Sequence, residues 1–121
     1  IADCMALTAG NTGLTLILFL SYSGKWDIFQ AANRALASNG GEGEITMEQL
    51  EAALCTRAAA IPDPDLLIRT SGEMRISNYM LWQSAYTEYY FTDILWPDFR
   101  KNEFKAALED YAKRERRYGK V

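Results

Sequence analysis

Apolar and polar positions alternate in blocks that predict strands and helices in turn. Residues 13–22 are apolar at nearly every position and rich in strand-forming side chains, which is typical of a strand buried between two helical layers. A second buried strand is predicted at residues 66–68, after a Pro-Asp-Pro approach that forces an extended chain. The aromatic run at residues 89–91 predicts a third strand.

Four segments have the spacing of amphipathic helices. Residues 28–38 carry an apolar stripe, with Asp27 as the expected N-cap and Asn-Gly-Gly after the last turn. A helix over residues 46–55 is predicted from the capping box of Thr46 and Gln49. Helical spacing also predicts helices at residues 76–85 and 102–117.

This order of elements predicts an α/β fold with a mainly parallel sheet and helices on both faces. Three strands are few for a layer covered on both faces, so we expect the chain to form part of a larger sheet. The chain begins at Ile1 and not at Met, which indicates processing or a longer parent protein.

Composition narrows the possible chemistry. The 121 residues are 49% hydrophobic and 24% charged, which suits one globular domain. The absence of His excludes Ser-His-Asp and Cys-His catalysis and histidine-ligated zinc. Cys4 and Cys55 have no metal or redox spacing, so we expect a cytoplasmic protein.

Charge is unevenly distributed. Residues 100–121 hold eight basic and four acidic side chains, a net of +4 in a chain of net charge −3. Such a basic end predicts either an anionic partner or the solvated end of a helix, where cations offset the helix dipole.

Polar residues with a preference for anions follow the second predicted strand. Arg69 and Arg75 flank a turn containing glycine, and Ser77 follows at a predicted helix start. Ligands of open α/β sheets bind outside the carboxyl ends of the strands, and arginine matches phosphate oxygens with a rigid fork of donors. This pattern predicts an anion site, and pairing of the arginines with Asp65 and Glu73 is the alternative.

Glu88 lies between an apolar segment and an aromatic strand, where an unpaired carboxylate would be costly. A Mg²⁺ ion bound beside substrate phosphates would satisfy it. A salt bridge to Arg69 or Arg75 would satisfy it equally well.

The segment from Arg69 to Asn78 closely resembles the signature of cis-prenyltransferases, in particular the undecaprenyl diphosphate synthase family. Leu-Trp-Gln at residues 81–83 and Ala-Tyr at residues 85–86 continue the resemblance. Similar blocks occur at residues 7–15, 24–28 and 88–99, and the end of the chain, residues 114–119, resembles the family's carboxyl terminus. The resemblance covers nearly the whole chain, in order.

The resemblance implies Mg²⁺-dependent condensation of isopentenyl diphosphate onto an allylic diphosphate such as farnesyl diphosphate, with new double bonds in cis. The product would be a polyprenyl diphosphate lipid carrier that partitions to the membrane, where the protein could sit peripherally, and no nucleic acid is implied. Positions matching Arg69, Arg75 and Ser77 would hold the isopentenyl diphosphate, helped by the backbone around Ile76, and Glu88 would help to place the metal. In the terminal Arg-x-Gly motif, Arg117 and Gly119 would reach a partner subunit's site in a homodimer.

The chain departs from the family pattern in three respects. Lys25 and Met74 stand where arginine and, in some relatives, histidine occur. The family's amino-terminal half, with its Asp-containing diphosphate loop, has no counterpart here. We therefore expect residues 1–121 to be the carboxyl-terminal portion of one domain, inactive alone and without a catalytic residue of its own. A non-catalytic accessory subunit of a heteromeric enzyme and an unrelated phosphate-binding module are the alternatives.

Overall fold

The computed structural model describes residues 1–117 and has a mixed α/β architecture. The strands β1 (Leu66–Arg69) and β2 (Glu88–Phe91) pair in parallel, with Leu66 opposite Glu88 and Arg69 opposite Phe91. Helix α5 (Lys101–Tyr111) packs against β2, after the short 3₁₀ helix η1 (Trp96–Asp98). The predicted mixed fold with a parallel sheet is confirmed, and two of the three predicted strands form it.

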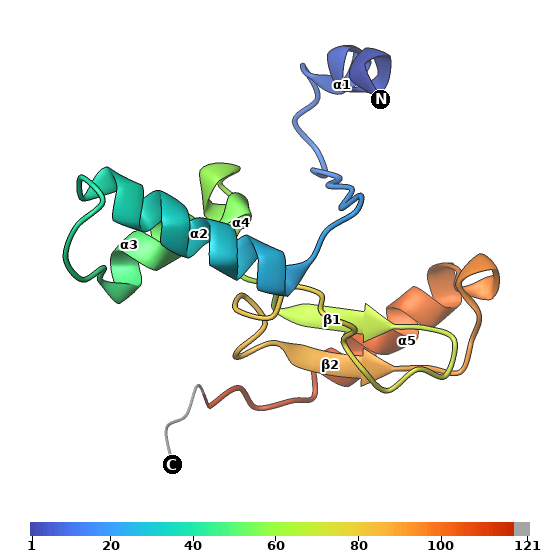
Figure 1. Cartoon of the computed structure of the whole chain (residues 1–121). Coiled ribbons are helices and arrows are strands. Elements are labelled where there is room, and N and C mark those ends of the chain that lie inside the picture. Colours follow the sequence, from blue (N-terminus) through green and yellow to red (C-terminus); the bar gives the residue numbers. More distant parts are fainter. Residues whose placement is uncertain (118–121) are drawn as a thin grey trace.

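Three further helices form a separate group (Figure 1). Helix α2 (Gly24–Ser38) packs against α3 (Met47–Ala52), and α3 contacts the short α4 (Cys55–Ala58). The predicted capping box is confirmed, because the Thr46 hydroxyl accepts from the Gln49 N–H at 3.2 Å and the Gln49 side chain accepts from the Thr46 N–H at 2.8 Å. The N-cap of α2 is Ser23 and not Asp27, since the Ser23 hydroxyl accepts the Trp26 N–H at 3.2 Å.

The strand predicted at residues 13–22 does not form. These residues run without regular structure between α1 (Ala2–Thr8) and α2 (Figure 1), and Leu14 and Leu18 are 94% and 64% exposed. A strand that is apolar on both faces needs a partner strand and two covering layers, and the part of the chain described here supplies neither. The segment rejoins the molecule at Phe19, whose ring packs edge-on against Tyr22 and Tyr79.

The helix predicted at residues 76–85 is also wrong, because a series of turns occupies this segment. Ser77, Asn78 and Met80 have φ angles of +48°, +64° and +46°, which interrupt a right-handed helix. The apolar spacing misled here because Gln83, assigned to the same stripe, is buried through polar contacts: its side-chain amide donates to Asp27 and to Thr56, each at 3.1 Å.

The last helix is shorter than predicted, since α5 ends at Tyr111 and not near residue 117. Beyond it, Arg114 donates to the Glu88 carboxylate at 2.8 Å and to the Tyr89 carbonyl oxygen at 2.9 Å, and Arg116 pairs with Asp65. These bonds hold residues 112–117 against the amino ends of β1 and β2. Within residues 112–117, the basic side chains of Arg114 and Arg116 therefore hold the chain to the sheet and do not form a solvated helix end.

The well-buried apolar side chains are few and mostly small. They are Ala31, Ala35, Leu54, Met80 and Ala107. Within residues 1–117, no helix is both long enough and apolar enough to cross a bilayer.

Candidate anion site

Arg69 is the last residue of β1 and begins the candidate anion site. Its backbone carbonyl accepts the Thr92 N–H at 2.9 Å, which ties the end of β1 to the segment after β2. The Arg69 Nε is buried and has no hydrogen-bond partner among residues 1–117. Because a buried unpaired donor is costly, this atom makes Arg69 a candidate donor to an anion.

The turn after Arg69 is held by backbone bonds. The Ser71 and Gly72 N–H groups donate to the Ile94 and Thr92 carbonyl oxygens at 2.9 and 3.0 Å. Gly72 has a φ of +69°, and a Cβ there would lie 3.2 Å from Asp93 Oδ1. The turn therefore favours glycine for its backbone conformation and for its close approach to Asp93.

A hollow of about 370 Å³ lies beside this turn. Gly72, Met74, Phe91, Thr92 and Asp93 line it. It lies at the carboxyl ends of both parallel strands, where ligands of α/β sheets bind. Arg69, Arg75, Ile76 and Ser77 are not among its lining residues, and its one charged side chain is the acidic Asp93, so the anion site remains a prediction.

Arg75 is two-thirds exposed and forms an ion pair with Glu73. This contact is one half of the alternative in which both arginines pair with acidic neighbours. The other half is not found, because Asp65 pairs with Arg116 and not with Arg69. Ile76 and Ser77 follow Arg75 directly, with Ser77 exposed, so the three residues form one accessible loop.

Glu88 lies at the other end of the sheet. It is the first residue of β2, opposite Leu66, whereas Arg69 is opposite Phe91. Three residues of a parallel strand span about 10 Å. The structure therefore does not bring Glu88 together with Arg69, and its salt bridge is to Arg114, at 2.8 Å, and not to either arginine considered from the sequence.

The described residues do not fit a Mg²⁺ site on their own. Among residues 1–117, no three side chains of His, Cys, Asp or Glu lie close enough together to hold a metal ion. The Glu88 carboxylate would have to release Arg114 before it could bind a cation. The pKa of Arg114 is raised, chiefly by its hydrogen bond to Glu88 and next by its hydrogen bond to Asp110.

The basic end of the chain contributes one further candidate. Arg117 is 68% exposed and forms an ion pair with Glu115, two residues before it, at 2.9 Å. It is accessible to a second molecule. Gly119, the other residue of the terminal motif, lies outside the described residues.

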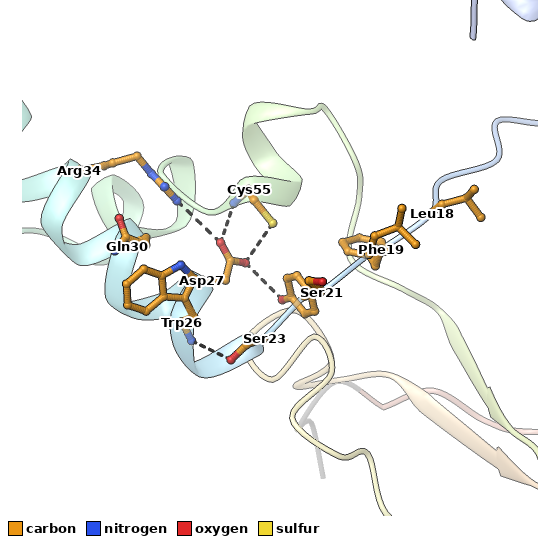
Figure 2. A pocket seen from close by; sticks show the side chains of 11 residues that line it. Leu18, Phe19, Ser21, Ser23, Trp26, Asp27, Gln30, Arg34 and Cys55 are labelled. Carbon is orange, nitrogen blue, oxygen red and sulfur yellow. Dashed lines mark hydrogen bonds and ion pairs between the residues drawn. The ribbon is translucent and has the colours of Figure 1, made fainter. Parts of the chain in front are cut away.

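A second hollow, of about 360 Å³, lies between residues 18–23 and α2 (Figure 2). At its centre is Asp27, which is only 6% exposed. The Asp27 carboxylate accepts hydrogen bonds from the Cys55 N–H at 3.0 Å and from the Gln83 amide at 3.1 Å, and Arg34 lies 3.7 Å away. Asp27 is thus a buried hydrogen-bonding centre, which sequence reasoning missed by treating it as a helix cap.

Two ionisable neighbours of Asp27 are held in their protonated forms. Burial, followed by the charge of Asp27, raises the pKa of Tyr22 to about 12. Its hydroxyl therefore stays a donor to Asp27 Oδ2, at 3.3 Å, across the ordinary pH range. Burial and the hydrogen bond to Asp27 likewise raise the pKa of the Cys55 thiol, whose Sγ lies 3.3 Å from Asp27 Oδ2.

This raised pKa predicts a difference between the two cysteines. Both cysteines are exposed, so access does not separate them. Thiolates are the reactive form, and at pH 8 Cys55 should therefore react with iodoacetamide several-fold more slowly than Cys4 on α1. Peptide mass spectrometry over a time course would measure both rates in one sample. Equal rates in the folded chain would contradict the prediction, and the urea-unfolded chain, where equal rates are expected, is the control.

An arginine-flanked turn at the carboxyl ends of parallel strands defines the class: an α/β protein with a candidate site for phosphate or diphosphate. Comparison with known proteins agrees with this class. Residues 1–119 match the family model described as putative undecaprenyl diphosphate synthase. The chain therefore belongs to the undecaprenyl diphosphate synthase, or cis-prenyltransferase, family.

Relatives within the family show how much of it the chain represents. It is 54% identical to an isoprenyl transferase of Neisseria gonorrhoeae, over the whole chain and 47% of the relative. It is 53% identical to a ditrans,polycis-undecaprenyl-diphosphate synthase, (2E,6E)-farnesyl-diphosphate specific, of Coxiella burnetii, over 93% of this chain and 48% of the relative. The chain spans about half the length of the curated relatives it matches.

Solved structures give the same result for the fold. Lavandulyl diphosphate synthase from Lavandula x intermedia, in complex with dimethylallyl diphosphate, superposes with a TM-score of 0.88 at 39% identity, over 99% of this chain and 52% of that one. A probable undecaprenyl diphosphate synthase from Campylobacter jejuni gives a TM-score of 0.72 at 35% identity, over 84% and 45%. Family membership removes the unrelated phosphate-binding module from the alternatives.

Proposed function

We propose that this chain supplies the isopentenyl diphosphate site of a cis-prenyltransferase that builds a polyprenyl diphosphate from an allylic diphosphate such as farnesyl diphosphate. The observation that carries the proposal is the buried Nε of Arg69, at the carboxyl end of β1, which has no hydrogen-bond partner among residues 1–117. The loop of Arg75, Ile76 and Ser77 follows along the chain, with Arg75 and Ser77 exposed. The names of the relatives support the assignment of the substrate class.

The residues would act on the substrate by neutralisation and positioning. The guanidinium groups of Arg69 and Arg75 would bind diphosphate oxygens through charge-assisted hydrogen bonds, and the Ser77 hydroxyl and the backbone at Ile76 would complete the contact. Arg75 would exchange the Glu73 carboxylate for the substrate. Fixing the diphosphate fixes the reactive end of the substrate, which is the main contribution that such a site makes to rate.

In this proposal the chain is the carboxyl-terminal portion of one domain and does not catalyse alone. Mg²⁺ is the expected cofactor of the whole enzyme, and Glu88 remains a predicted ligand only if it exchanges Arg114 for the ion. Arg117 and Gly119 would contact the site of a second subunit in a homodimer. The exposure of Arg117 supports this assignment.

Titration calorimetry tests the proposed site without requiring turnover. The chain should bind isopentenyl diphosphate, inorganic diphosphate should compete for the same site, and ATP should not bind more tightly than either. Tight nucleotide binding, with none for isopentenyl diphosphate, would overturn the proposal.

A further inference from the structure

The amino-terminal end of α2 is joined to the Arg75–Ser77 loop through a single residue, Asn78. The Lys25 N–H donates to Asn78 Oδ1 at 2.9 Å, and the Gly24 N–H donates to the Asn78 carbonyl oxygen at 2.7 Å. The Asn78 side-chain amide donates to the Ser23 hydroxyl at 2.8 Å. Two backbone donors at the first turn of α2, which have no partners within the helix, are thus satisfied by this one residue.

The contact is close as well as hydrogen-bonded. A Cβ on Gly24 would lie 2.8 Å from Leu81 Cγ and 3.0 Å from the Asn78 carbonyl oxygen. Only glycine fits here without displacement of the loop. The loop and the helix therefore have one relative position, set by backbone atoms on both sides.

The loop adopts a backbone conformation that needs contacts from outside the loop to stabilise it. Ser77 and Asn78 both have positive φ angles, +48° and +64°, which are uncommon for residues other than glycine and most tolerated by Asn and Asp. The bonds from Asn78 to Ser23 and Lys25 hold this conformation from outside the loop. Ser77 is adjacent to Asn78, and Arg75 is three residues before it.

We propose that Asn78 is a positioning residue for diphosphate binding. It does not touch the substrate; it fixes the Arg75–Ser77 loop on the amino-terminal end of α2, so that the guanidinium and hydroxyl groups are in place before the anion arrives. This inference rests on the proposed function, which assigns Arg75 and Ser77 to the diphosphate. A loop that is ordered beforehand binds more tightly because the ordering cost is not taken from the binding free energy.

Two substitutions at Asn78 separate positioning from folding. Asn78→Gly tolerates the left-handed backbone and removes both side-chain bonds. Asn78→Asp also tolerates that backbone, and its carboxylate can accept from the Lys25 N–H and from the Ser23 hydroxyl. The matched control is Asn39→Gly, which removes an asparagine hydrogen-bonded to Gln49 at 2.8 Å at the other end of α2.

Calorimetric titration of the full chain with inorganic diphosphate provides the test, with thermal unfolding followed in parallel. We expect Asn78→Gly to weaken binding about tenfold or more, Asn78→Asp to recover part of that loss, and Asn39→Gly to bind within about twofold of the unsubstituted chain. Hydrogen exchange at the Lys25 amide should rise in Asn78→Gly and return toward normal in Asn78→Asp.

Two results would overturn the inference: binding by Asn78→Gly within twofold of the unsubstituted chain, or an equal loss in Asn39→Gly. Failure of the unsubstituted chain to bind diphosphate overturns the proposed function and this inference with it. The titration of the unsubstituted chain alone would reveal that failure. The positioning role, in contrast, is overturned when the unsubstituted chain binds diphosphate and Asn78→Gly binds it equally well.

Discussion

Arg75→Ala should lower incorporation of isopentenyl diphosphate, by the protein that carries this chain, at least about 100-fold, or about 3 kcal/mol in kcat/KM. The physical reason is the loss of a guanidinium that would bind diphosphate oxygens when it leaves Glu73. Arg75→Lys should recover only part of this loss, because lysine keeps the charge and loses the fork of donors. Labelled isopentenyl diphosphate, an allylic diphosphate and Mg²⁺ are the components of the assay.

The matched control for this substitution is Arg57→Ala. Arg57 is also an exposed arginine paired with an acidic neighbour, Asp63, at 2.9 Å, but it lies on α4. Its removal should leave incorporation within about twofold, since exposed ion pairs contribute little. Normal turnover by Arg75→Ala would show that the diphosphate is bound elsewhere.

Asp27→Ala should have the largest effect on stability, lowering the free energy of unfolding by about 3 kcal/mol. The substitution leaves the Gln83 amide and the Cys55 N–H without the acceptor that now lies 3.1 and 3.0 Å away. These donors come from segments far apart in the sequence, so the loss also separates α2 from α4 and from the turns around Gln83. Urea unfolding followed by tryptophan fluorescence measures the change, with Trp26 beside the site.

The comparison substitution is Asp63→Ala, which also removes a carboxylate and an ion pair, but on the surface. Asp63 is about half exposed, and its loss should cost below about 1 kcal/mol. A similar small cost for Asp27→Ala would show that the Asp27 contacts do not contribute to stability.

The sequence predicts local features of this fold well. The capping box of Thr46 and Gln49 and the strands ending in Arg69 and Phe91 depend on side chains within a few residues of one another, and all are found. The segment that follows Arg69 lies at the carboxyl end of β1, as strand polarity requires, and its role in binding an anion remains a prediction.

The errors concern contacts between distant residues. Whether residues 13–20 form a strand depends on partners that local spacing does not reveal. Asp27 and Gln83 have positions compatible with a cap and a helix stripe, yet they meet across 56 residues. The sequence does contain a signal for this contact. Gln83 is a polar side chain within the apolar stripe of the helix predicted at residues 76–85, and a polar residue at such a position can indicate a buried hydrogen bond.

Glu88 shows the same limit at a functional position. The sequence predicts that its carboxylate has a partner, either Mg²⁺ or one of the arginines Arg69 and Arg75. The partner is Arg114, 26 residues later, which reaches Glu88 because the chain turns back after α5.

The irregular segment before α2 affects the tendency of the chain to aggregate in solution. Residues 14–20, Leu-Thr-Leu-Ile-Leu-Phe-Leu, contain no charge, no proline and no glycine, and their leucines face solvent. Seven residues of this composition are the kind that stack into intermolecular sheets. Colloidal stability therefore depends on this short segment, and so does the concentration at which a titration can be run. Leu16 is 76% exposed, and a charged substitution there, such as Leu16→Lys, should keep the chain monodisperse.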